Sequence, residues 1–352
     1  MDLHHGIRSN LDQFLQQLLQ VWLVGLTLGM MRTVIPALAE SDFGVPKNSF
    51  VLLSSFVVAF GLVKGVMNFL AGRLSERHGR KKVLLLGWLV ALPIPVMIWH
   101  APSWNWIVAA TVLLGIHQGL AWSMTQTFPR YPRNVSANPG TWEIFTLMSW
   151  RDKRLMALSQ AGLVEKFVDA LVWVFYPVFL YQRGVSLPSV GWIIGVYGFV
   201  WGGSQLFTGR LSDHLGRHRP NVWGMWICGA GVAMMVLGEG LTWWAVSAGI
   251  TGFGMALLYP NLSAAVADIA QPAWRGSAIG IYRFWRDLGY GIGALGLGLA
   301  AHFSGQMEMA FWFVAVSMFA SGSVLAWLGE ETHPRLHPDT STSDPVGPYE
   351  RR

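Results

Sequence analysis

Two stretches of this sequence are near copies of each other, and they decide the fold. Residues 72–82 read GRLSERHGRKK, and residues 209–219 read GRLSDHLGRHR. The order Gly, Arg, Leu, Ser, acid and then Gly-Arg recurs at the same offsets, and internal repetition is itself a signal of fold. The glycines permit a tight turn between two closely packed helices. The acid can bond helix N-terminal amides or a neighbouring arginine. A generic basic loop need not repeat this pattern, so we interpret the two loops as one duplicated element.

The composition is that of a membrane protein. Of 352 residues, 53% are hydrophobic and 12% are charged, whereas an ordinary soluble domain has roughly 25% charged residues. The mean hydropathy is +0.40. These values exclude a soluble enzyme, a disordered chain and a secreted disulfide scaffold, and the single cysteine, Cys228, allows no disulfide within one chain. Lys and Arg in cytoplasmic loops explain the formal net charge of +6, so we expect no nucleic-acid partner.

Ten apolar stretches are near the length that crosses a bilayer of ~30 Å. They cover residues 15–38, 50–71, 83–100, 104–126, 156–181, 187–208, 220–238, 241–266, 277–301 and 309–329. The stretches are continuously apolar and do not alternate, which disfavours a β-barrel. We therefore expect an all-α integral membrane protein with about ten transmembrane helices in contact with the lipid bilayer.

The basic residues of the loops predict the orientation. With the N-terminus in the cytoplasm, only Lys47 and Arg183 fall outside, and all other loop Lys and Arg fall inside, as the positive-inside rule requires. Both termini are then cytoplasmic. The expected organisation is a cytoplasmic N-terminus (1–14), a bundle of four spans (15–126), a cytoplasmic linker (127–155), a bundle of six spans (156–330) and a disordered cytoplasmic tail (331–352).

The duplicated loop resembles the signature loop of the major facilitator superfamily, Gly-x-Leu-Ser-Asp/Glu-x-x-Gly-Arg. Glu76 replaces the usual Asp in the first copy, and His214 stands where a base is usual in the second. Arg275 and Gly276, followed by Tyr282 and further glycines and charges, are similar to the eleventh helix of that family. The resemblance implies gating loops that contain Gly72, Glu76, Arg77, Gly79, Arg80, Gly209, Asp213, Gly216, Arg217 and Arg275.

The same resemblance implies two six-helix halves around a central cavity, but this chain shows four spans followed by six. Two spans follow the first repeated loop before the linker, whereas four follow the second. Counterparts of family helices five and six are therefore missing, which would open a wall beside Ser204 and Gln205. An oligomer or a rearranged fourth span is expected to cover that wall, or the chain is a copy that no longer transports.

Charged residues inside the expected spans are costly and often mark transport pathways, and seven of them form a candidate layer. This intramembrane charge layer consists of Lys64, Glu165, Lys166, Asp169, Arg283, Arg286 and Asp287. At 1.5 Å of rise per residue, Lys64, Glu165, Arg283 and Asp287 lie roughly 12–18 Å from the inner basic anchors. If span 50–71 lies against span 277–301, as in the family, the charged residues of the two spans share one layer of the membrane.

This layer has two interpretations. In the first, Asp287 or Glu165 couples transport to protons, with Lys64 and Arg283 as competing counter-charges. In the second, the charges form fixed salt bridges that only join the two halves.

Other polar groups are suited to a substrate cavity, although a single such residue more often forms a hydrogen bond between packed helices. The candidates are Arg32, His117, Gln118, Trp122, Gln205, Tyr259 and Asn261. The sequence has no Gly-rich nucleotide loop and no His-Glu-x-x-His motif. We therefore expect no enzyme activity, no cofactor and no metal.

The function that the resemblance implies is secondary active transport of a small solute by alternating access. The expected location is a bacterial inner (plasma) membrane, and coupling to protons is one form that this transport can take. The alternative is a transporter-derived membrane protein that binds a ligand or partner without moving it. The intact repeat favours the first function, and the missing helix pair favours the second.

Overall fold

The computed structural model describes residues 49–125, 140–271 and 274–334, together with Leu336 and parts of 11–46. The N-terminal helices are α2 (Phe50–His78), α3 (Arg80–Ala91), α4 (Pro93–Trp99) and α5 (Trp104–Thr125). Helix α6 (Thr141–Thr146) and a π-helical turn (Leu147–Arg151) follow. The C-terminal helices are α7 (Lys153–Gln182), α8 (Leu187–Leu215), α9 (His218–Leu237), α10 (Leu241–Ile269), α11 (Arg275–Ser304) and α12 (Glu308–Leu328).

The protein is an all-helical membrane protein. Six helical segments of the described chain are long and apolar enough to cross a bilayer: Phe50–Ala71, Arg80–Trp99, Leu187–Leu215, His218–Leu237, Leu241–Ile269 and Glu308–Leu328. Each expected span from residue 50 onward is helical. In the first expected span, residues 18–25 are helical and the rest lies mostly outside the described residues. Helices α7 and α11 each carry three of the intramembrane charges, whereas α2 carries only Lys64, which explains why apolarity alone does not select α7 and α11.

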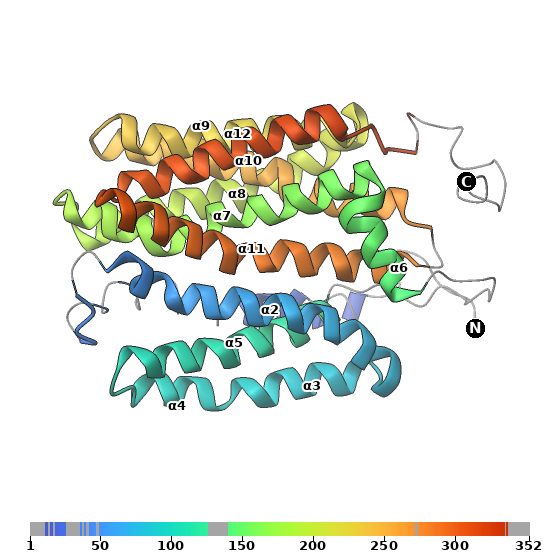
Figure 1. Cartoon of the computed structure of the whole chain (residues 1–352), viewed down its shortest axis with the longest axis horizontal. Coiled ribbons are helices and arrows are strands. Elements are labelled where there is room, and N and C mark those ends of the chain that lie inside the picture. The colour runs from blue at the N-terminus through green and yellow to red at the C-terminus, as the bar shows by residue number, and fades with distance from the viewer. Residues whose placement is uncertain are drawn as a thin grey trace.

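The long helices run side by side along the longest axis of the molecule (Figure 1). In the N-terminal bundle, α5 packs on α2 and α3. In the C-terminal bundle, α10 packs on α8 and α9, while α12 packs on α7 and α9. Helix α11 lies along α2, and this pair forms the most extensive contact between the bundles. The family arrangement predicted this pairing of the second and ninth spans.

Small residues allow α2 and α11 to approach closely. A Cβ atom on Gly65 would lie 3.1 Å from the backbone nitrogen of Leu288, and one on Gly61 would collide with the backbone of Gly291. A Cβ on Gly298 would lie 2.7 Å from Ser54 Oγ. Helices pack through small residues in this way when lipid supplies no hydrophobic force to bring them together.

Two local features depart from the expected spans. The third span is broken at Leu92 into α3 and α4, because Pro93 has no N–H to donate and its ring crowds the preceding turn. Part of the expected linker is also helical and packs on α11. The Phe145 ring lies 5.8 Å from that of Phe284, and Trp285 donates a hydrogen bond to Ser149 Oγ at 2.9 Å.

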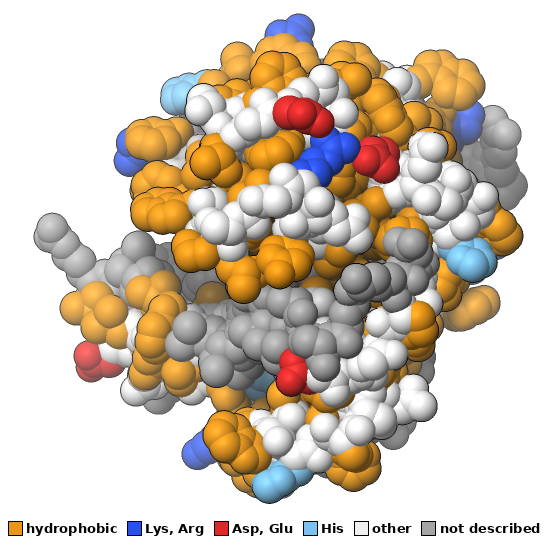
Figure 2. All heavy atoms as spheres, turned by 90° about the vertical axis from the view of Figure 1, so that its left-hand side faces the viewer, with side chains coloured by type: hydrophobic (Ala, Val, Ile, Leu, Met, Phe, Trp, Pro, Cys, Tyr) orange, Lys and Arg blue, Asp and Glu red, His pale blue; other side chains and the backbone are white. Residues whose placement is uncertain are grey.

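Figure 2 shows one end of the molecule, where hydrophobic side chains line much of the outer edge of the upper half. Charged side chains gather in a small group at the end that faces the viewer. At the corresponding end of the helices, Arg183 pairs with Glu308 at 2.8 Å and with Glu239 at 3.3 Å. These pairs tie together the α7–α8, α9–α10 and α11–α12 connections.

Candidate functional site: a buried charge layer between the two bundles

The first part of the site is an ion pair between the bundles. Lys64 Nζ on α2 lies 3.5 Å from Asp287 Oδ1 on α11, and Asn68 Nδ2 donates a hydrogen bond to Asp287 Oδ2. Lys64 and Asn68 are four residues apart and therefore share one face of α2. All three side chains are buried. The ionised carboxylate of Asp287 thus depends on two groups from the opposite bundle.

The second part is a group of charges on α7. Lys166 Nζ lies 3.0 Å from Glu165 Oε1 and 2.7 Å from Asp169 Oδ2. Glu165 also accepts a hydrogen bond at 3.1 Å from Arg286 Nε on α11. These four residues are at most 6% exposed. A buried charge is tolerated only when it is paired and hydrogen-bonded, and here each carboxylate has at least two donors.

Two tyrosines also donate hydrogen bonds to Asp169. Tyr197 on α8 donates to Asp169 Oδ1 at 2.9 Å, and Tyr290 on α11 donates to Asp169 Oδ2 at 3.0 Å. With Lys166, this carboxylate accepts three hydrogen bonds and joins α7, α8 and α11.

Aromatic rings surround the cations of the layer. Lys166 Nζ lies 5.7, 5.2 and 5.3 Å from the ring centroids of Trp201, Tyr259 and Tyr290. The Tyr290 ring also lies 5.0 Å from Lys64 Nζ, and the Arg286 guanidinium lies 4.2 Å from the Tyr259 ring. Tyr290 therefore touches both groups of charges. Such contacts partly replace the lost hydration of a buried cation.

Six residues of the expected layer thus lie in two groups of ion pairs, one around Asp287 and one around Lys166. Arg286, and not Arg283, bonds Glu165. Arg283 lies four residues before Asp287 on α11 and is only half-buried. Tyr197, Trp201 and Tyr290 were absent from the sequence candidates. The i, i+4 spacing of Tyr197 and Trp201, at the depth of the charges, is the signal that points to them.

The other cavity candidates mostly face neighbours within their own bundle. His117 Nδ1 lies 3.0 Å from the carbonyl oxygen of Gly87 on α3, Gln118 Nε2 donates to Val24 O at 2.9 Å, and Asn261 Nδ2 donates to Leu257 O at 2.6 Å. Trp122 and Gln205 are half-buried, and Arg32 lies outside the described residues. Of this set, Tyr259 contacts the charge layer.

The two repeated loops have matching backbones. Gly79 and Gly216, at the same position of the repeat, have φ of 84° and 88°, a region in which a side chain is strained. In the second loop Asp213 lies 3.1 Å from Arg217 Nη1, and Arg217 Nε lies 3.3 Å from Asp268. The side chains of Arg73, Glu76 and Arg77 in the first loop lie outside the described part. Arg275 donates from Nε to Ala270 O at 3.1 Å.

A segment after α12 docks on the second loop, although residues from 331 onward were expected to form a disordered tail. Glu331 accepts hydrogen bonds from the backbone N–H of Arg217 at 2.7 Å and of His218 at 3.1 Å, at the start of α9. Its Oε1 also accepts from Thr332 N and His333 N. Burial alone would raise the pKa of Glu331, but these four backbone donors hold that pKa below its usual value. A carboxylate that caps a helix N-terminus orders this segment.

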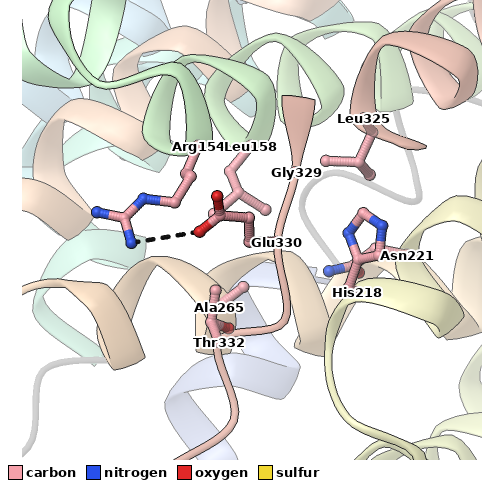
Figure 3. A pocket seen from close by; sticks show the side chains of 9 residues that line it. All are labelled: Arg154, Leu158, His218, Asn221, Ala265, Leu325, Gly329, Glu330 and Thr332. Carbon is pink, nitrogen blue, oxygen red and sulfur yellow. Dashed lines mark ion pairs between the residues drawn. The ribbon is translucent and has the colours of Figure 1, made fainter. Parts of the chain in front are cut away.

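A small hollow lies beside this contact (Figure 3). Its lining comes from α7, α9, α10, α12 and the segment after α12: Arg154, Leu158, His218, Asn221, Ala265, Leu325, Gly329, Glu330 and Thr332. Arg154 points toward Glu330, and the two form an ion pair at 3.7 Å. The hollow lies between the ends of α7, α9, α10 and α12, at the end of the molecule that carries the second repeated loop.

Comparison with known proteins identifies the class. Residues 18–130 and 160–350 match the family described as Major Facilitator Superfamily. An uncharacterized MFS-type transporter of Salmonella typhimurium is 24% identical over 39% of this chain and 35% of that protein. Another, of Burkholderia mallei strain SAVP1, is 28% identical over 44% of this chain and 36% of that protein. The matches thus span about a third of these relatives.

A solved structure shares the fold. The crystal structure of a D-xylose-proton symporter superposes with a TM-score of 0.67, over 90% of this chain and 98% of that chain, at 14% sequence identity. The chain therefore belongs to the major facilitator superfamily and is an integral, multi-pass membrane protein of a secondary transporter family.

Proposed function

We propose that this protein carries a small solute across the membrane by alternating access, coupled to protons through Asp287 or Glu165. The observation that carries the proposal is the buried Lys64–Asp287 pair, which joins α2 and α11 across the two bundles. The structural neighbour is a D-xylose-proton symporter, which supports coupling to protons.

Alternating access requires the bundles to rock against each other around a central site. The Lys64–Asp287 pair resists that motion, because separating buried opposite charges leaves each of them unpaired in a low-dielectric interior. Protonation of Asp287 removes its charge and weakens its attraction to Lys64. Binding of the proton thus favours separation of α2 from α11, and re-formation of the ion pair favours release of the proton.

Glu165 is the second candidate for the proton. It lies within one bundle, between Lys166 and Arg286, so its protonation would weaken its attraction to both cations without parting α2 from α11. Lys166 would stay paired with Asp169. Tyr290 touches Lys64 and Lys166. Protonation of either carboxylate would therefore affect the other through Tyr290.

The remaining elements have a place in this scheme. We propose that the repeated loops gate the cytoplasmic side, that both termini are cytoplasmic, and that the protein lies in a bacterial inner membrane. The positive-inside distribution of Lys and Arg supports this orientation.

The test is an uptake screen in proteoliposomes with the purified protein. Sugars, amino acids, organic acids and organic cations are offered separately, each with and without an inside-alkaline pH gradient, and protein-free liposomes are the control. We expect at least one solute to accumulate only when the gradient is imposed. Ligand-induced thermal stabilisation without uptake of any solute would instead favour the transporter-derived binding protein.

A further inference from the structure

The helix between the two bundles has an inner and an outer face. Helix α6 and the π-helical turn form one helical stretch, from Thr141 to Arg151. Ile144 and Met148 are four residues apart and buried, whereas Trp142 and Trp150 are 71% and 61% exposed. The outer face of this stretch therefore presents two indole rings, a large apolar surface, away from the bundles.

The two exposed rings are held in place from below by Phe145. The Trp142 ring stacks on that of Phe145 with centroids 5.3 Å apart, and the Trp150 ring meets Phe145 edge-on at 5.7 Å. Phe145 in turn stacks on Trp285 of α11 at 5.9 Å, one residue before Arg286 of the charge layer. The outer face is thus a fixed aromatic platform that is joined to α11.

The platform lies at the level where the membrane spans end. Helix α6 is at one end of the molecule and runs at a steep angle to the long helices (Figure 1). Helix α7 begins at Lys153, and the apolar segment of α12 ends at Leu328. Tryptophan is enriched at this depth, where its ring meets the lipid headgroups. A helix that lies across the bundle with tryptophans on its outer face has the features of an interfacial helix.

This end of the molecule is basic. Arg151 and Lys153, directly beside the platform, are exposed and have no ion pair among the residues that the structure describes. The other exposed Lys and Arg described at the same end are Arg80, Lys81, Lys82, Arg210 and Arg219. The exposed acids there are Glu143, Asp213 and Glu330. A surface with this excess of bases is attracted to anionic lipid.

An open hollow adjoins the platform between the start of α7 and the end of α12. It is lined by Asp152, Lys153, Arg154, Trp327, Leu328 and Glu330. Arg154 bonds the Asp152 carboxylate and pairs with Glu330, so it offsets part of the acidic charge of the lining. Lys153 and the 84% exposed Trp327 remain to face a ligand, and an ammonium group binds phosphate as a point charge.

From these observations we infer that the helix between the bundles is a docking site for anionic phospholipid. Trp142 and Trp150 enter the headgroup region, while Arg151 and Lys153 bind lipid phosphate beside Trp327. Lipid is the occupant because the face lies at headgroup depth and combines indoles with an excess of bases. The inference goes beyond transport and stands whether or not the protein moves a solute.

The first test locates the outer face relative to the bilayer. A fluorophore is attached through Glu143→Cys, at an exposed position of α6, in nanodiscs of phosphatidylcholine and phosphatidylglycerol in equal parts. Cys228 is buried, and the unsubstituted protein measures its background labelling. The control position is His214→Cys, an exposed residue of the second repeated loop.

We expect spin-labelled lipid to quench the fluorophore at position 143 more strongly than the one at position 214, and aqueous iodide to show the reverse order. The double variant Trp142→Gln with Trp150→Gln should make position 143 accessible to iodide. Access of iodide to position 143 without these changes would overturn the inference, because the face would then be open to water and to a protein partner.

The second test identifies the headgroup. The melting temperature of the delipidated full-length protein in detergent is measured with phosphatidylglycerol or phosphatidylcholine added. We expect a larger rise with phosphatidylglycerol, and Arg151→Gln with Lys153→Gln should lose most of the difference. The conservative pair Arg151→Lys with Lys153→Arg should keep the difference, as should the control Arg210→Gln at the exposed end of α8. Equal rises with both lipids, or an equal loss in the control, would contradict the site.

Discussion

At the scale of single residues, the account rests on Asp287 and its two partners from α2. Removing one member of a buried ion pair leaves the other charge uncompensated, at a cost of about 3–5 kcal/mol. We therefore predict that Lys64→Met strongly lowers the melting temperature in detergent. In the double variant Lys64→Met with Asp287→Leu no charge is stranded, so it should recover much of the loss. A double variant less stable than Lys64→Met would contradict the pairing.

Glu331 gives a second prediction, which depends on pH. Its pKa is lower in the folded protein than in the unfolded chain. Its stabilising effect is therefore present above the usual pKa of a glutamate and is lost as the pH falls through the folded pKa. Glu331→Gln should cost about 0.5–2 kcal/mol at pH 7, as loss of a helix cap does.

The measurement for Glu331 is the melting temperature of both proteins as a function of pH. The wild type should be more stable at pH 7, and the two curves should converge as the pH is lowered below the usual glutamate range. The exposed Glu239 supplies the control, Glu239→Gln. A gap between wild type and Glu331→Gln that is constant with pH would argue against the charged cap.

At the scale of helices, the account depends on the close contact of α2 and α11. A Cβ on Gly61 would lie 2.7 Å from Tyr290 Cβ and would collide with the Gly291 backbone. We predict that Gly61→Ala costs about 1–3 kcal/mol, as overpacking does, and slows any transport that the protein catalyses. Thermal unfolding measures the loss of stability, and proteoliposome uptake measures the rate of transport.

The matched control is Gly195→Ala on α8, where a Cβ would meet open space. It should leave stability unchanged or slightly higher, because alanine favours a helix over glycine. If Gly61→Ala behaved like Gly195→Ala, the two helices would not be packed as described.

Much of the arrangement of the helices could be predicted from the sequence. The apolar stretches predict the helices, the repeat predicts tight turns at its glycines, and the depth arithmetic predicts that Lys64 and Asp287 share one layer. The partner of Glu165 could not be predicted, because Arg283 and Arg286 are both near that depth and the rotation of α11 about its axis depends on packing. Likewise, the docking of Glu331 depends on where the chain after α12 meets α9. Pro93, in contrast, was a visible signal for the break after α3.

At the scale of the whole molecule, the orientation in the membrane is open to test. Alkaline phosphatase, which is active only outside the cytoplasm, is fused at Ser136 in the expected linker or at Gly240 between α9 and α10. The distribution of Lys and Arg predicts an inactive fusion at Ser136 and an active one at Gly240. Activity at Ser136 would overturn the orientation and the assignment of the repeated loops to the cytoplasm.

The central claim is that a carboxylate of the charge layer carries the coupled proton. The most direct measurement compares proton-driven uptake by the wild type, Asp287→Asn and Glu165→Gln in proteoliposomes, using a solute that the wild type accumulates. The charge swap Lys64→Asp with Asp287→Lys is measured beside them. We predict that the neutral variant of the coupling carboxylate still equilibrates the solute but no longer responds to the pH gradient. Full dependence on the gradient in both neutral variants would contradict the claim, and normal uptake by the swap would show that the pair only joins the two bundles.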